Sequence, residues 1–149
     1  MDILAAKMPL SLSVIAMEIE IQKITDEFGK LKSVYSYVFQ FKDEAEMKAV
    51  IHLKFESGDV FHEAKPDTDE ISCSSSLMDK YQASINISSE LPWKNVIGKG
   101  VRWIWNLKNQ QGYNDAIQYA FANPEENETL IQLIVEASEI KTYGISEKL

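Results

Sequence analysis

The 149-residue sequence predicts a mainly β or α+β fold: an antiparallel sheet curled into a half-barrel or sandwich, with one or two short helices. Several runs alternate apolar and polar residues with the period of a β-strand, most clearly residues 51–55 and 101–107. Turn-forming residues such as Gly, Asn and Pro separate these runs. No strand-then-helix rhythm repeats along the chain, so a doubly wound parallel sheet is not expected.

The first predicted element, within residues 10–28, fits both the period of a helix and the period of a strand. An apolar stripe from Leu10 to Phe28 recurs at helical spacing, whereas residues 18–22 (EIEIQ) alternate like a strand. Gly29 lies where a type I hairpin turn needs a positive φ. We therefore predict a hairpin in which Thr25 pairs with Lys30. Residues 1–16 are expected to form a loosely attached leader or a short helix, and residues 17–149 a single globular domain.

The remaining elements follow from alternation and turn signals. A second hairpin is predicted over residues 51–64, a short strand over 84–88, and a helical turn that starts at Pro92 and ends at Gly98. Further strands are expected over residues 101–107, 117–121, 129–137 and 140–145. Trp103 and Trp105 share one face of the 101–107 strand, and we expect them to be largely buried together with Trp93.

Charge and composition limit the classes of partner. Fifteen basic residues against 23 acidic ones give a net charge of −8, and the isoelectric point is near 4.8. Such a field repels nucleic acid and anionic lipid, so neither is expected as a partner. The single Cys73 cannot form an intramolecular disulfide, and the N-terminus is a poor signal peptide. A cytoplasmic location is therefore predicted.

The two histidines are the first candidates for chemistry. A three-residue turn in the 51–64 hairpin, with Gly58 last, would place His52 opposite His62, close enough to share a metal ion. A two-residue Ser57-Gly58 turn would instead pair His52 with Glu63 and send His62 to the other face. The sequence leaves this register open. No third ligand is fixed by spacing, so we predict no metal site, no cofactor and no catalytic residue, and lean against an enzyme.

Acidic residues suggest a docking surface. Residues 43–70 and 125–139 are rich in Asp and Glu, and if they converge in the fold they form one anionic face. Bacterial immunity proteins that neutralise basic toxins use such faces, because opposite charge steers association. The equally strong alternative is a solvated exterior. The predicted partner-binding residues are Asp67, Asp69, Glu70 and Glu63.

An amide-rich stretch around Tyr113 is the best candidate for a small-ligand site. Amides both donate and accept hydrogen bonds, so they can read a sugar, a base edge or a partner backbone. They also build turns, which is the simpler explanation here. The predicted ligand-binding residues are Asn109, Gln110, Gln111, Tyr113 and Asp115.

The same region carries a family resemblance. The elements Gly98-Lys99, Trp103-Ile104-Trp105 and residues 109–113 (NQQGY) are similar to those of a family of small uncharacterised bacterial single-domain proteins, a domain of unknown function. The resemblance implies a bacterial cytosolic protein and assigns no activity.

We therefore predict a non-enzymatic, acidic protein-binding module that docks on a basic partner. The alternative is a small metal-assisted hydrolase or ligand-binding protein that uses His52 and His62 or the amide-rich residues 106–118. The oligomeric state cannot be read from the sequence.

Overall fold

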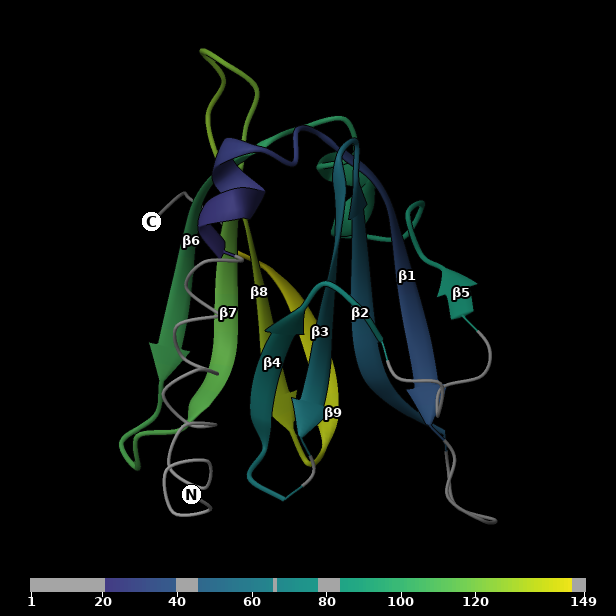
Figure 1. Ribbon diagram of the computed structural model, residues 1–149, viewed down its shortest axis with the longest axis vertical. Helices are drawn as coiled ribbons and strands as arrows, with labels where there is room; N and C mark the ends of the chain where they lie inside the picture. The colour runs from purple at the N-terminus through teal and green to yellow at the C-terminus, as the bar shows by residue number, and fades with distance from the viewer. Residues whose placement is uncertain (1–20, 40–45, 66, 78–83, 146–149) are drawn as a thin grey trace, which may run out of the picture.

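Two antiparallel sheets pack face to face in the computed structural model, which describes residues 21–39, 46–65, 67–77 and 84–145 (Figure 1). The first sheet has the strand order β4-β3-β2-β1-β5 and contains β1 (Leu31–Phe39), β2 (Met47–Phe55), β3 (Gly58–Lys65), β4 (Glu70–Ser74) and β5 (Ser84–Asn86). The second has the order β6-β7-β8-β9 and contains β6 (Val101–Lys108), β7 (Asn114–Phe121), β8 (Thr129–Glu136) and β9 (Glu139–Ile145). The predicted mainly antiparallel β fold is confirmed.

The core lies between the two sheets. Side chains that alternate along each strand point into it, and Val34, Leu53, Ile117, Ile131 and Leu133 are fully buried there. Strands β2 and β9 contact each other across the core, as do β4 and β7. This arrangement buries one face of each sheet, as in other sandwiches of two packed sheets.

The predicted first strand of the first hairpin is wrong where the structure describes it. Residues 21–26 form a helix, and Ile24 on its inner side is buried in the core. Phe28 then packs its ring against Phe55, with ring centroids 5.9 Å apart. Gly29, with φ +79°, follows the helix in the left-handed conformation that commonly ends a helix. The helical stripe therefore prevails over the alternation. Residues 1–20, with the predicted leader, lie outside the described residues.

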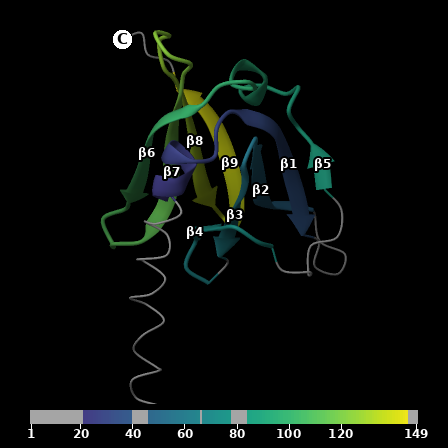
Figure 2. The same cartoon turned by 45° about the horizontal axis from the view of Figure 1, so that its top comes forward.

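The segments that lead into β1 and β6 cross one end of the sandwich side by side (Figure 2). Lys30 pairs with Gly100, the Leu31 N–H donates to the Lys99 carbonyl at 2.9 Å, and the Gly98 N–H donates to the Leu31 carbonyl at 2.8 Å. Backbone hydrogen bonds thus join the two sheets at this end.

The predicted helical turn after Pro92 is a 3-10 helix, η1 (Trp93–Asn95). Its position depends on Gly144 in β9, because a Cβ atom there would lie only 3.1 Å from the Cβ of Pro92. The close approach of Pro92 to β9 places the buried Trp93 between the sheets. Within the described part of the chain, no helix is long and apolar enough to cross a membrane.

Candidate functional site

The β2–β3 hairpin has neither of the two registers predicted from the sequence. Phe55 lies opposite Gly58, so His52 pairs with Phe61 and His62 pairs with Ile51. Gly58 belongs to β3, so the turn consists of Glu56 and Ser57, and a Cβ atom at position 58 would lie 2.6 Å from the ring of Phe28. The two imidazoles consequently lie on opposite faces of the sheet and cannot share a metal ion.

His52 lies on the outer face of the first sheet. Its Nε2 is 2.7 Å from Oδ1 of Asp59, and its ring stacks on Phe61 with centroids 4.1 Å apart. Tyr35 stacks on it from the neighbouring strand at 5.5 Å. The described residues contain no cluster of three or more His, Cys, Asp or Glu side chains that could hold a metal ion. The arrangement orients the imidazole but packs aromatic rings around it.

His62 is fully buried in the core between β3 and β7. Its Nδ1 donates to the carbonyl of Ser72 at 3.1 Å, so Nε2 is left to accept a hydrogen bond from the hydroxyl of Tyr119 on the opposite sheet. Burial lowers the pKa of His62 from 6.5 to about 4, because a charged imidazole would lose its hydration. His62 is therefore neutral near pH 7 and links the two sheets.

Three turns meet at the end of the sandwich opposite the crossing segments, and they contain most of the sequence-predicted site residues (Figure 1). Oδ1 of Asp69 accepts a hydrogen bond from the Ser138 N–H at 3.0 Å, and Oε2 of Glu70 accepts one from the Asn114 N–H at 3.2 Å. Asp67 is exposed in the same turn, whereas Glu63 lies further along β3. Segments 67–70 and 136–139, which come from the two acid-rich regions, thus lie together.

The predicted amide site is the turn between β6 and β7. Oδ1 of Asn109 accepts hydrogen bonds from the N–H groups of Gln111 at 2.9 Å and Tyr113 at 3.2 Å. The Asn109 side-chain amide also lies 3.5 Å from Asp115. These contacts build the turn, and they leave Gln110, Gln111 and Tyr113 exposed to solvent.

The expected burial of Trp103 and Trp105 is wrong. Trp103 is 57% exposed and Trp105 is 42% exposed, whereas Trp93 is 1% exposed as predicted. The pairing of β6 with β7 shifts register between Val101 and Trp103. Val101 faces the core, and after this irregularity Ile104 faces it in place of the two tryptophans. An irregularity of this kind reverses which alternate residues point inward.

The exposed tryptophans belong to a continuous outward surface of the β6–β9 sheet, here called the aromatic face. Strand pairing places its residues in three parallel rows, and only Lys141 among them is charged. The rows are Trp103, Ala120, Leu130 and Ile145; Trp105, Gln118, Gln132 and Tyr143; and Leu107, Ala116, Ile134 and Lys141.

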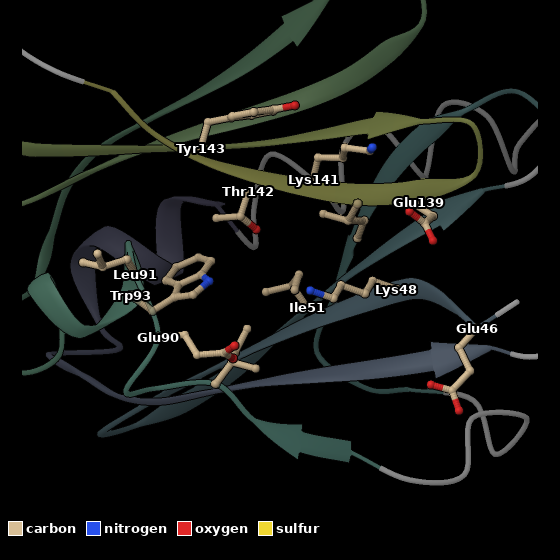
Figure 3. A pocket seen from close by; sticks show the side chains of 12 residues that line it. Glu46, Lys48, Ile51, Glu90, Leu91, Trp93, Glu139, Lys141, Thr142 and Tyr143 are labelled. Atoms are coloured by element: carbon tan, nitrogen blue, oxygen red, sulfur yellow. The ribbon is translucent and has the colours of Figure 1, made fainter.

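A cleft of about 410 Å³ lies between β9 and β2 (Figure 3). Apolar side chains and charged side chains both line it. The apolar ones are Ile51, Ile87, Leu91, Trp93 and Ile140, and the charged ones are Glu46, Lys48, Glu90, Glu139 and Lys141. A register shift between Tyr37 and Val38 pairs Val38 with Lys48, and thereby turns Lys48 towards the cleft. No sequence signal indicated this cleft, because both the bulge and the approach of η1 to β9 depend on tertiary pairing.

Comparison with known proteins gives a family and nothing further. The model of a family of unknown function, DUF6334, matches residues 17–148. This range contains the Gly98-Lys99, Trp103–Trp105 and 109–113 elements, so the predicted resemblance to a domain of unknown function is confirmed. Neither a curated protein nor a solved structure matches the chain.

Proposed function

The chain belongs to this family of unknown function, and we propose that it is a non-enzymatic, acidic protein-binding module that docks on a basic partner through the aromatic face. The two histidines support a role without catalysis. One is buried between the sheets and the other is packed among aromatic rings, and they point to opposite sides of the sheet.

The composition of the aromatic face carries this proposal. When one side of an antiparallel sheet meets water, its residues are usually polar. Here the three rows of the aromatic face contain one charged residue, although 26% of the chain is charged. Trp103, Trp105 and Tyr143 stand exposed among smaller apolar residues. Half-exposed Trp and Tyr side chains are typical of the energetic centre of protein interfaces.

Acidic residues border the aromatic face on one side. Glu136 pairs with Glu139 at the end of the sheet, in the next row beyond Ile134 and Lys141. The hydrogen bond from Ser138 to Asp69 brings the turn that carries Asp67 beside this row. A partner with an apolar patch edged by Lys or Arg would complement both parts. The apolar centre would supply affinity, and the acidic border would raise the rate of association.

The test compares what the immobilised protein and its variants retain from a lysate of the source cells. Trp105→Ser removes an aromatic side chain from the centre of the face, and we expect it to weaken retention of a basic protein by about 30-fold or more. The double variant Glu136→Lys, Glu139→Lys reverses the border and should slow association about tenfold at low salt, with a smaller difference at high salt.

The matched control is Glu27→Lys, Glu125→Lys, which changes the net charge equally; Glu27 follows the helix of residues 21–26, and Glu125 lies in the β7–β8 loop, at the end of β8 opposite Glu136. It should bind like the unaltered protein. The proposal is wrong if the retained protein binds Trp105→Ser equally well, if no basic protein is retained, or if the face proves to join two copies. Sedimentation would show the last outcome as a dimer that Trp105→Ser dissociates.

A further inference from the structure

We propose that the cleft between β9 and β2 is a binding site for a small zwitterion with an apolar body, of the size of an amino acid. The cleft adjoins the aromatic face, because Lys141 and Tyr143 of β9 belong to both, but the proposed binding does not depend on the docking function. Its volume of about 410 Å³ lies within the range of ordinary small-molecule sites.

A hydrogen-bond donor without a partner among the described residues lies at the cleft. The Trp93 side chain is almost fully buried, yet its indole N–H forms no hydrogen bond within the described part of the chain. Figure 3 shows this nitrogen on the side of the indole that faces Ile51 and Lys48. This nitrogen is not one of the fully buried unpaired atoms of the described residues, so it meets the solvent in the cleft, and an acceptor atom of a ligand could replace water as its partner.

Lys48 supplies a positive charge at the same place. Its side chain enters from β2, and Figure 3 shows the ammonium directed towards the indole of Trp93. Thr142 points into the cleft from β9 and adds a hydroxyl group. An indole N–H, an ammonium and a hydroxyl together offer donors to a carboxylate, and the ammonium makes such hydrogen bonds stronger than neutral ones.

The opposite charge is also present. Glu90 lines the cleft on the side of Trp93, and Glu46 and Glu139 line its far end. A ligand with only a carboxylate would be repelled by these acidic side chains. A ligand with both an ammonium and a carboxylate would pair with the acidic side chains and with Lys48. Ile51 and Ile140 form apolar walls that fit an aliphatic or aromatic body. The lining therefore favours a zwitterion over either single charge.

The test follows the Trp93 indole N–H signal of the isotope-labelled protein by nuclear magnetic resonance. Trp103→Phe and Trp105→Phe identify the other two indole signals. The probes are L-leucine, isocaproate, which lacks the amine, and isoamylamine, which lacks the carboxylate. We expect L-leucine to shift the Trp93 signal saturably, and each half-probe to bind at least tenfold more weakly.

Two cleft variants and one control complete the experiment. Lys48→Met should weaken L-leucine binding about tenfold, and Glu90→Gln should weaken L-leucine but not isocaproate, which has no ammonium to pair with Glu90 and is relieved of its negative charge. Lys54→Met, an exposed change on the same strand away from the cleft, should have no effect. The proposal is overturned if no probe gives a saturable shift, if isocaproate binds as well as L-leucine, or if Lys48→Met binds like the unaltered protein.

Discussion

His52 and His62 come from adjacent strands of one sheet, yet their surroundings give the two imidazoles different chemistry. His52 is held at the outer face by Asp59 and retains a carboxylate partner. His62 points into the core, where the Ser72 carbonyl fixes the tautomer and Tyr119 completes the hydrogen bonding. A buried imidazole that forms hydrogen bonds through both nitrogens can connect two packed sheets. It destabilises the fold only when it is protonated, because a buried charge is then desolvated.

The His62 pKa predicts how stability depends on pH. Above about pH 6.5 the imidazole is neutral in both the folded and the unfolded chain, so its full contribution is present. Between pH 6.5 and about 4 the unfolded chain takes up a proton that the folded chain refuses. The free energy of unfolding should therefore fall by about 3 kcal/mol across this window, as measured by chemical denaturation.

Two measurements separate His62 from the many carboxylates that also titrate at low pH. His62→Gln should lose stability at pH 7 but have a shallower decline between pH 6.5 and 4. In the unaltered protein, the His62 ring resonances should titrate near pH 4. A His62 titration near pH 6.5 would contradict the prediction even if the variant does not fold.

At the scale of elements, Gly29 joins the helix to the β2–β3 turn. Its φ of +79° is unfavourable for any other residue, and an added Cβ would lie 2.8 Å from Oε1 of Glu56. That oxygen accepts a hydrogen bond from the Lys30 N–H at 2.7 Å, so it cannot move without losing this contact. We expect Gly29→Ala to lower the free energy of unfolding by about 2–3 kcal/mol, measured by denaturant titration.

Gly98 provides the control, because its φ is +85° and an added Cβ would meet nothing within 4 Å. Gly98→Ala should cost only the backbone strain, about 1–2 kcal/mol. Adding Glu56→Ala to Gly29→Ala should remove most of the difference between the two glycines. Equal losses for Gly29→Ala and Gly98→Ala would refute a role for Glu56.

The limits of sequence-based prediction also lie at the scale of elements. Alternation located β2, β3 and β6 to β9 because each buries one face against the core. It misplaced Trp103 and Trp105 because a local shift in the β6–β7 pairing reverses the side chains that follow it. For the same reason the sequence did not indicate Lys48 as a cleft residue: a register shift in the β1–β2 pairing turns its side chain towards the cleft. Around residues 21–26 both periods fit, and packing of Ile24 on the core decided between them.

At the scale of the whole molecule, different kinds of hydrogen bond connect the two sheets at the two ends of the sandwich. At one end, Leu31, Gly98 and Gly100 hold the sheets together through backbone pairing. At the other, Asp69 and Glu70 hold neighbouring turns through single side-chain acceptors. Backbone pairs survive most substitutions, whereas each carboxylate contact depends on one residue. The acidic end, which borders the proposed docking surface, is therefore the end that single substitutions can loosen.

Amide hydrogen exchange tests this difference. Asp69→Gly removes the carboxylate and tolerates the φ of +51° at this position, so it should speed exchange of the Ser138 amide by about tenfold. Glu70→Ala should do the same for Asn114. The Leu31 and Gly98 amides at the opposite end should keep their rates, because their acceptors are backbone carbonyls. Faster exchange at both ends would indicate a global loss of stability and would refute the idea that the two ends are stabilised independently.

If the change is confined to the turns, Asp69→Gly can also be used to test the acidic border. It should slow association with a basic partner by misplacing Asp67, while leaving the aromatic face intact.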